Sequence, residues 1–457
     1  MTERKIKKEL QKYLGKEKVF SDREYLLTYS YDATGIQSWP ELVVLPESDD
    51  DIRHILEIAN KYNVPVTPRG AGVGLSGGSV PLEKGILICF SRMNKILDID
   101  RDSFTAVVEP GVVTYDLQTA CEEMGLFYPP DPASLKTSTI GGNVAENAGG
   151  LRCFKYGVTG SYVLALEGFL VDGTKIKAGS PCIKDVAGYD IKSLLIGSEG
   201  TLAVISKIYL KLIPLPEARV LCRVDFSSLA EGARFINNMI NSGIQPAVLE
   251  FMDKSSIEAS YRYMGIPVED APDAIVLSEI DGNALDVGAR KDKFLAMVKE
   301  QQVKDFRVAE TTEEKELLWS LRRNISPAIS KIKPKKINED IVVPTGKIPE
   351  AVERIKGIGR RLNLEIVLFG HFGDGNIHTN VLVDPEDADE MKRAEQALDE
   401  IFKYVVSVNG SITGEHGVGI SKRPFLSYQF SDDEIALFKN IKNVFDPGNV
   451  LNPGKIF

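Results

Sequence analysis

The sequence predicts a protein of mixed helices and strands, divided into two or three domains. Its 457 residues exceed what one hydrophobic core usually supports. Glycine-rich, polar segments mark the first part of the chain, and this character fades after residues 212–216, where we expect a linker. From residue 217 to about 415, strand-like and helix-like segments alternate. We therefore expect a glycine-rich domain followed by a domain of different character.

The composition is that of an ordinary soluble globular protein, with 43% hydrophobic and 26% charged residues. A net charge of −10 without a basic patch argues against a nucleic-acid partner. We expect no transmembrane segment, because no run of 18 apolar residues occurs, and no secretory signal, because the start is charged. Five scattered cysteines without a CxxC spacing predict neither a disulfide framework nor an iron–sulfur cluster. A cytoplasmic location is the expectation that follows.

The pattern of apolar residues predicts the individual elements in order. Residues 1–30 are helical in pattern, and 49–60 form an amphipathic helix opened by acidic residues, in which His54 is expected to be structural. Further strands are expected at 41–46, 63–68, 85–90 and 104–111, and a helix at 114–124. In the second half the alternating segments are 219–224, 229–242, 246–252, 274–280 and 289–300.

Residues 69–79 form the first candidate binding loop. Five of the nine residues from Gly70 are glycine, so bare backbone amides could wrap a pyrophosphate, with Arg69 as a further donor. Gly72, Gly74 and Gly77 match the GxGxxG pattern of nicotinamide-binding folds. That pattern should open directly into a helix, whereas here a strand is expected after Val80-Pro81. We therefore reject the nicotinamide interpretation and keep phosphate binding.

A second segment of small residues and amides lies at 138–150. Each of the two glycine-rich segments taken alone is equally consistent with a tight turn between packed elements. Two in one domain, both polar, favour a long ligand bound along its length.

Three of the four histidines fall in two glycine-rich segments of the second half. His371 and His378 flank Asp374-Gly375, a pair typical of a two-residue hairpin turn. Such a turn would place the two histidines opposite each other on paired strands, with Cβ atoms about 5 Å apart. His416 follows Glu415 in the other segment. One isolated histidine would be interpreted as structural, but this set indicates a metal site of the His₂Glu type, with zinc, manganese, iron and cobalt all open.

Several motifs in order resemble a known flavoprotein superfamily. They are the 68–78 loop, Pro129-Pro130-Asp131-Pro132, Gly141-Gly142-Asn143, Lys155-Tyr156-Gly157 and the 197–202 segment Gly-Ser-Glu-Gly-Thr-Leu. These resemble the FAD-binding domain of the vanillyl-alcohol oxidase/PCMH superfamily. With 370–380, 414–419 and Asn452-Pro453-Gly454 added, the chain is similar to the subgroup of D-lactate dehydrogenases, glycolate oxidase FAD subunits and D-2-hydroxyglutarate dehydrogenases.

The resemblance implies an α+β fold with a two-subdomain PCMH-type FAD-binding domain and an α+β substrate domain. The implied boundaries are 1–216 for the FAD domain, 217–415 for the substrate domain, and 416–457 for a C-terminal segment that packs back on the FAD domain. In the superfamily the first two loops hold the FAD pyrophosphate and residues equivalent to 197–205 close over the cofactor. Some relatives tether FAD through a histidine where this chain has Val73, so noncovalent FAD is predicted.

The cofactor-binding residues that the resemblance implies lie in these loops and in the C-terminal tail. They are Arg69, Gly70, Ala71, Gly72, Val73, Gly74, Ser76, Gly77, Pro130, Asp131, Ser138, Thr139, Gly141, Gly142, Asn143, Asn147, Gly150, Tyr156, Gly157, Glu199, Gly200, Thr201, Ile205 and Asn452.

The implied reaction is oxidation of a D-2-hydroxy acid, with D-lactate or glycolate as the first expectation, to the 2-oxo acid. A metal held by His371, His378 and Glu415 would lower the pKa of the substrate hydroxyl. His416 would take the proton. Arg322 would bind the carboxylate, unless it is a solvated arginine on a helix face. Spacing alone leaves open whether His416 is the ligand and Glu415 the base.

Three further points follow from the resemblance. Ser326 and Lys336 are weaker candidates for substrate contacts. Electrons would pass to an external acceptor such as an electron-transfer flavoprotein, an iron–sulfur subunit or a quinone, and the chain would be a homo-oligomer or part of a complex. The alternatives are an exchange enzyme without net oxidation, similar to alkylglycerone-phosphate synthase, and a silent FAD-carrying electron-transfer subunit.

Overall fold

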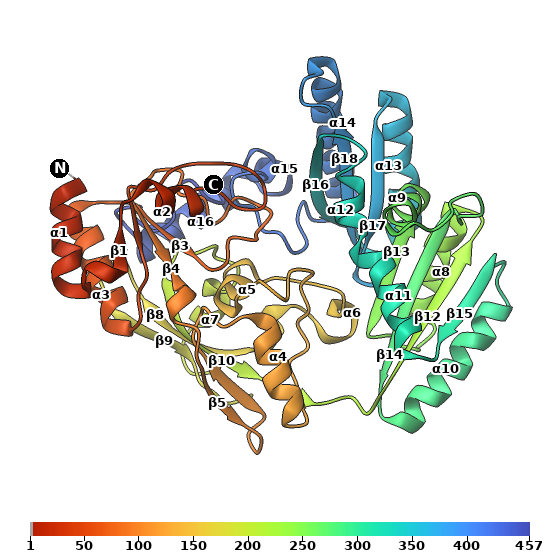
Figure 1. Ribbon diagram of the computed structural model, residues 1–457, viewed down its shortest axis with the longest axis horizontal. Helices are drawn as coiled ribbons and strands as arrows, with labels where there is room; N and C mark the ends of the chain where they lie inside the picture. Colours follow the sequence, from red (N-terminus) through yellow and green to blue (C-terminus); the bar gives the residue numbers. More distant parts are fainter. Residues whose placement is uncertain (1–2) are drawn as a thin grey trace. The chain divides into compact units, whose positions relative to one another are not determined.

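The computed structural model describes residues 3–457 and divides the chain into two compact units (Figure 1). Unit 1 comprises residues 1–149, 158–215 and 415–457, and unit 2 comprises residues 150–157 and 216–414. The α+β class is confirmed, because helices and strands are mixed in both units. None of the helices within residues 3–457 is both long and apolar enough to cross a bilayer.

The first sheet of unit 1 has the strand order β1-β2-β4-β3. Its strands are β1 (Val19–Phe20), β2 (Leu42–Val44), β3 (Val66–Arg69) and β4 (Ile86–Cys89), and the last three pair in parallel. Helices α1 (Glu3–Leu14) and α3 (Asp49–Tyr62) cover it with a buried apolar stripe that includes Leu10, Ile52 and Ile55. The expectation of helix throughout residues 1–30 is wrong, because β1 interrupts it before α2 (Arg23–Thr28).

The second sheet of unit 1 is antiparallel, with the order β5-β6-β10-β8-β9. These strands are β5 (Ile96–Asp100), β6 (Thr105–Val108), β8 (Val163–Phe169), β9 (Lys175–Gly179) and β10 (Val204–Lys211). Beside them lie α4 (Thr114–Glu123), α5 (Ile140–Glu146) and α7 (Ile191–Leu195), and a two-stranded ladder joins β7 (Leu126–Phe127) to β11 (Ile213–Pro214). The C-terminal residues add α15 (Leu426–Gln429) and α16 (Asp432–Phe445).

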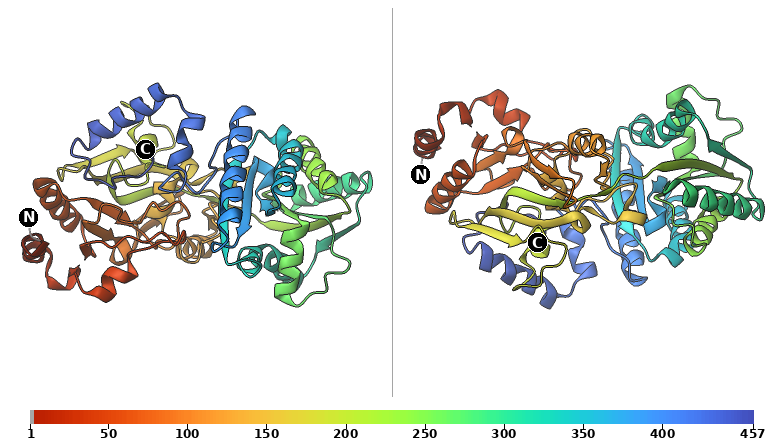
Figure 2. Two further views of the ribbon diagram at one scale, coloured as in Figure 1. Left: turned by 90° about the horizontal axis from the view of Figure 1, so that it is seen from above. Right: turned by 90° about the horizontal axis from the view of Figure 1, so that it is seen from below.

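Unit 2 is built on one antiparallel sheet of seven strands, with the order β15-β12-β14-β13-β17-β18-β16 (Figure 2). The strands are β12 (Ala218–Phe226), β13 (Val248–Asp253), β14 (Ala274–Gly282), β15 (Asp305–Ala309), β16 (Lys335–Val342), β17 (Glu365–Gly370) and β18 (Asn376–Val383). The central strands β13, β14, β17 and β18 are buried along almost their whole length, which suits a sheet that is covered on both faces.

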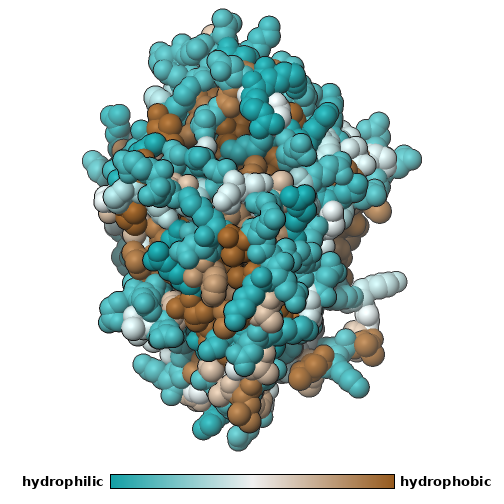
Figure 3. All heavy atoms as spheres, turned by 90° about the vertical axis from the view of Figure 1, so that its right-hand side faces the viewer, coloured by the Kyte–Doolittle hydropathy of each residue, from teal (hydrophilic) through white to brown (hydrophobic). Residues whose placement is uncertain are grey.

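Helices cover the two faces of this sheet. One face carries α8 (Leu229–Asn241), α10 (Ala284–Lys299), α13 (Ile348–Leu362) and α14 (Ala388–Ser407). The other packs against α9 (Lys254–Met264), α11 (Thr312–Arg323) and α12 (Ile325–Ile329). Hydrophilic side chains cover most of the face of unit 2 that Figure 3 shows, with hydrophobic residues in small groups between them. Met252 and Phe369 lie on the sheet face that packs against α9, α11 and α12, which is also the face of the histidine site described below.

Candidate cofactor and metal sites

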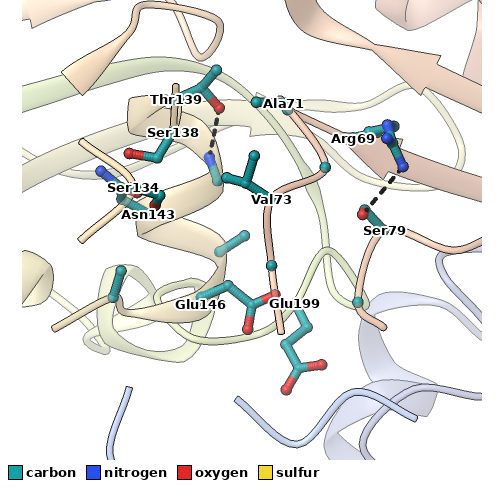
Figure 4. A pocket seen from close by; sticks show the side chains of 18 of the residues that line it. Arg69, Ala71, Val73, Ser79, Ser134, Ser138, Thr139, Asn143, Glu146 and Glu199 are labelled. Carbon is teal, nitrogen blue, oxygen red and sulfur yellow. Dashed lines mark hydrogen bonds between the residues drawn. The ribbon is translucent and has the colours of Figure 1, made fainter. Parts of the chain in front are cut away.

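A large pocket opens in unit 1 between the glycine-rich segments (Figure 4). Its space amounts to about 1320 Å³ when the part open to solvent is included. Residues 68–75, 138–149 and 199–205 contribute to its walls, and Glu415 and His416 line it as well. Two loops rich in backbone amides therefore line one pocket, as a ligand bound along both of them requires.

The two glycine-rich segments approach each other closely at Gly70. A Cβ atom placed on Gly70 would lie 2.2 Å from Oγ1 of Thr139. Thr139 is itself the N-cap of α5, where its hydroxyl accepts the N–H of Gly142 at 3.3 Å. Only glycine fits at residue 70, because any side chain would collide with Thr139, the N-cap of α5, and displace the first loop.

We expect Gly70→Ala to weaken binding of the cofactor by opening the contact between the two loops. Gly288→Ala is the control, because Gly288 lies in α10, outside the pocket lining, and nothing lies within 4 Å of a Cβ there. Both variants add one methyl group to a glycine. Bound cofactor per polypeptide after purification checks the prediction, and equal losses in the two variants would contradict it.

The pocket brings together fourteen of the residues expected to bind the cofactor. They are Arg69, Gly70, Ala71, Gly72, Val73, Gly74, Ser138, Thr139, Gly141, Gly142, Asn143, Glu199, Gly200 and Ile205. The pocket lining does not include Ser76, Gly77, Pro130, Asp131, Asn147, Gly150, Tyr156, Gly157, Thr201 or Asn452.

Two of the expected binding residues brace the pocket walls. Nη1 of Arg69 donates to the carbonyl of Tyr31 at 2.7 Å, and burial lowers the pKa of this guanidinium. Nδ2 of Asn452 donates to the carbonyls of both Gly78 and Glu199, at 2.8 and 2.7 Å. Asn452 therefore ties the first loop to the 197–201 segment.

Tyr156, which was expected to bind the cofactor, forms a hydrogen bond within unit 2. Its hydroxyl donates to Asp281 at 2.7 Å, and the same carboxylate forms an ion pair with Lys155. These contacts hold the segment 150–157 against β14. The sequence did not predict this attachment.

The site in unit 2 is built around His371 and His378. The expected two-residue hairpin turn at Asp374-Gly375 is wrong: the connection from β17 to β18 spans residues 371–375 and contains a 3-10 turn at Phe372–Asp374. His378 therefore lies opposite Phe369 in the ladder, and His371 lies in the connection. Phe372 is fully buried and stacks on Phe251 with ring centroids 4.4 Å apart, which holds the connection in place.

The two histidines nonetheless meet. Their Nε2 atoms are 3.4 Å apart, and both side chains are buried, at 4% and 7% exposure. Two imidazole ligands at the usual zinc–nitrogen distance in a tetrahedral site are separated by about 3.3 Å. The spacing of the pair therefore fits two ligands of one ion.

Glu250 of β13 fixes the orientation of His371. Its Oε1 atom is 2.5 Å from Nδ1 of His371, and its Oε2 atom accepts from Nε of Arg322 at 2.5 Å. Burial raises the pKa of Glu250, but the charges and hydrogen bonds of His371 and Arg322 outweigh it and lower the pKa to about 2. With Nδ1–H donated to this carboxylate, the Nε2 atom of His371 is available as a ligand.

Sequence reasoning missed Glu250. The available signal was a carboxylate in the middle of the apolar run of the strand Val248–Asp253, whose residues are all buried. A buried acidic residue without a partner is costly, so its presence indicates a partner of opposite charge.

We expect Glu250→Gln to lower metal affinity by about 10- to 100-fold, the usual effect of removing the partner of a ligating histidine. Glu167→Gln is the control, because Glu167 is a buried carboxylate of unit 1 whose partners are Tyr209 and lysines. Competition with a coloured chelator measures the affinity. Unchanged affinity in Glu250→Gln would contradict the assigned role.

Arg322 lies near the end of α11 and is 8% exposed. The guanidinium stacks 4.7 Å from the centroid of the Phe369 ring and uses Nε for Glu250. A solvated arginine is therefore excluded, and its fork of Nη groups can bind a carboxylate. The two weaker candidates lie together, since Nζ of Lys336 donates to Oγ of Ser326 at 2.7 Å.

Asp340 of β16 anchors the chain before Glu415. It lies directly opposite His378 in the ladder, and its Oδ2 atom accepts the N–H of Gly414 at 2.8 Å. Thr413 also donates its hydroxyl to this carboxylate. Glu415 follows Gly414 by one peptide bond, at the point where the chain passes into unit 1.

The glycine-rich pocket and the fold define a flavoprotein, and comparison with known proteins specifies the family. Residues 40–179 match the FAD binding domain, and residues 215–456 match the C-terminal domain of FAD linked oxidases. The chain belongs to the FAD-linked oxidases.

Curated relatives extend over nearly the whole chain. The glycolate oxidase subunit GlcD of Bacillus subtilis (strain 168) is 41% identical and covers 100% of this chain and 97% of the relative. D-lactate dehydrogenase of Anaerostipes hadrus is 34% identical, with 91% and 89% covered, and D-2-hydroxyglutarate dehydrogenase of Stutzerimonas stutzeri (strain A1501) is 34% identical over 100% of both. The family resemblance seen in the sequence is thus confirmed.

Solved structures share the fold at low sequence identity. p-Cresol methylhydroxylase aligns with a TM-score of 0.82 at 15% identity, covering 99% of this chain and 96% of the other. Alkyldihydroxyacetonephosphate synthase aligns with a TM-score of 0.77 at 18% identity, covering 98% and 85%. These alignments confirm the PCMH-type architecture.

Proposed function

We propose that this protein is an FAD-dependent dehydrogenase that oxidises a D-2-hydroxy acid, D-lactate or glycolate first, to the 2-oxo acid. The observation that carries the proposal is the set of His371, His378 and Arg322 around one buried carboxylate, Glu250. The set combines two potential metal ligands with a cation for a carboxylate. The names of the three curated relatives above all specify oxidation of 2-hydroxy acids or dehydrogenation of them.

The residues of unit 1 fit FAD. The glycine-rich loops offer backbone amides to a pyrophosphate in a pocket that both of them line. FAD supplies the hydride acceptor when it is bound. Val73 cannot form a covalent link, which favours a cofactor held without one.

The residues of unit 2 fit a divalent metal. His371 and His378 would hold it through Nε2, with Glu415 as the third ligand, and zinc suits this donor set best. Manganese, iron and cobalt remain alternatives. A bound ion lowers the pKa of a coordinated hydroxyl group.

The chain's own side chains provide the remaining steps. Arg322 binds the substrate carboxylate and so fixes the direction of the C2–H bond. His416, which lines the flavin pocket, accepts the hydroxyl proton on its imidazole. Oxidation at C2 therefore releases one proton to His416 and one hydride to the acceptor.

Electrons leave through an external acceptor in this proposal, such as an electron-transfer flavoprotein or an iron–sulfur subunit, in the cytoplasm. The name of the Bacillus subtilis relative includes the word subunit, which favours assembly with other chains. A pure protein that reduces oxygen as fast as an artificial dye would contradict an external acceptor.

Two other functions are possible on the same fold. An exchange enzyme of the alkyldihydroxyacetonephosphate synthase type, or a silent FAD-carrying subunit, would have no use for the His371, His378 and Arg322 set. A dye-linked assay in which a hydrazine traps the 2-oxo acid tests the proposal. Trapped 2-oxo acid in a one-to-one ratio with reduced dye is expected, and dye reduction without 2-oxo acid would contradict it.

A further inference from the structure

The segment that carries His416 is fastened to unit 1 at four backbone N–H groups. Those of Val418 and Gly419 both donate to the carboxylate of Glu199, each at 2.8 Å. Those of Ile420 and Ser421 donate to the carbonyl of Ser76, at 2.7 and 3.2 Å. The His416 segment is thus tied to two loops that also form walls of the flavin pocket or adjoin them.

The backbone of Glu199 has a strained conformation. Glu199 has a φ of +52°, in the left-handed region that favours glycine, and the nearby Gly197 and Gly200 also have positive φ. Such a conformation persists in a residue with a side chain only when its surroundings require it. The strain is offset by two hydrogen bonds, because each carboxylate oxygen of Glu199 accepts one backbone N–H.

Glu199 is also buried, at 5% exposure. Burial raises the pKa of this carboxyl to about 7, against the two backbone N–H groups and the charges of Lys455 and Lys422, which lower it. Burying a carboxylate is unfavourable unless its hydrogen bonds are retained. The two bonds to residues 418 and 419 meet that requirement.

Gly417, next to His416, lies in a slot between two carboxylates. A Cβ placed on it would lie 2.2 Å from Oε2 of Glu146 and 3.0 Å from Oε1 of Glu199, and its φ is +78°. Figure 4 shows the side chains of Glu146 and Glu199 together on one side of the pocket, opposite Ser138 and Thr139. The residue after His416 is therefore constrained in both position and backbone angle.

We propose that Glu199 is a positioning residue for His416: its carboxylate holds the backbone of residues 418 and 419 and thereby fixes the imidazole relative to the flavin pocket. The inference rests on the proposed function, in which His416 is the base. The positioning role differs from a cofactor-binding role, since both carboxylate oxygens of Glu199 accept backbone N–H groups of the protein. A base displaced by about 1 Å loses on the order of 10²-fold in rate.

Glu199→Gln tests this, because the amide oxygen can accept only one of the two N–H groups. Asp446→Asn is the matched control. Asp446 is a buried carboxylate of unit 1 that also accepts two backbone N–H groups, from Val450 at 2.9 Å and Leu451 at 2.7 Å, away from the pocket lining. Both variants are examined as the full-length holoprotein for flavin content, for anaerobic flavin reduction by the hydroxy acid, and for reoxidation of photoreduced flavin by a dye.

We expect Glu199→Gln to retain flavin, to be reduced on the order of 10²-fold more slowly, and to be reoxidised at the wild-type rate. Asp446→Asn should match the wild type in both half-reactions. Loss of flavin from Glu199→Gln, unchanged reduction, or an equal slowing of both variants would overturn the inference.

Two additions make the result decisive. In a His416→Ala background, Glu199→Gln should cause no further slowing, because a residue that acts only through His416 has nothing left to position. If Glu199→Gln does not fold, Gly417→Ala disturbs the same segment while leaving Glu199 in place, and it should slow reduction alone. A wild-type protein that no 2-hydroxy acid reduces would refute the proposed function itself, whereas a failure confined to the variants would refute only the positioning role.

Discussion

Replacing His416 by alanine should strongly slow flavin reduction by the hydroxy acid while leaving bound flavin and bound metal unchanged. The imidazole is the proposed acceptor of the hydroxyl proton, and general-base catalysis typically contributes about 10²- to 10⁴-fold. Single-turnover reduction under anaerobic conditions measures the loss. Elemental analysis of the same sample is required, because the sequence left open whether His416 or Glu415 is the ligand.

The fourth histidine provides the control for this experiment. His54 in α3 lies on the surface of unit 1 and stacks on Tyr13. Its Nδ1 atom is 3.3 Å from Oε2 of Glu57. His54→Ala should reduce flavin at the wild-type rate. Loss of metal from His416→Ala would reverse the assignments of His416 and Glu415.

Replacing His378 by alanine should remove the metal and, with it, turnover. His378 and His371 present Nε2 atoms 3.4 Å apart, so His378→Ala leaves one imidazole and only two of the three proposed ligands. We expect less than one tenth of the wild-type metal content and a loss of turnover on the order of 10³-fold, since the hydroxyl pKa is no longer lowered.

The flavin is the internal control for the His378 variant. It binds in unit 1, so its stoichiometry should not change. A chelator should inactivate the wild type, and one divalent ion per chain should restore it. Full activity in a metal-free His378→Ala protein would contradict the metal site.

Much of the flavin unit could be predicted from the sequence because its signals are local. The loop at 69–79 and the segment at 138–150 are rich in glycine, and both line the pocket. The α3 helix, with Ser48 as its N-cap, runs over Asp49–Tyr62, close to the expected 49–60. Such signals depend on a few neighbouring residues and need no knowledge of distant parts of the chain.

The site in unit 2 could be predicted only in part, because its contacts join distant residues. The two histidines were recognised from an assumed tight turn, although the 371–375 connection contains a 3-10 turn and His378 pairs with Phe369. Glu250 is 121 residues from His371 and 72 from Arg322, and no local pattern joins them. The link from Asp340 to Gly414 is equally remote in sequence.

The most direct test of the proposed function is the visible spectrum of the purified protein under anaerobic conditions, before and after addition of D-lactate, L-lactate, glycolate and D-2-hydroxyglutarate, with elemental analysis of the same sample. The proposed reaction transfers hydride to the flavin, so a D-2-hydroxy acid or glycolate should bleach the oxidised flavin absorption, L-lactate should not, and about one transition-metal ion per chain should be present. A flavin that no hydroxy acid bleaches, in a protein without metal, would contradict the account and favour the exchange enzyme or the silent subunit.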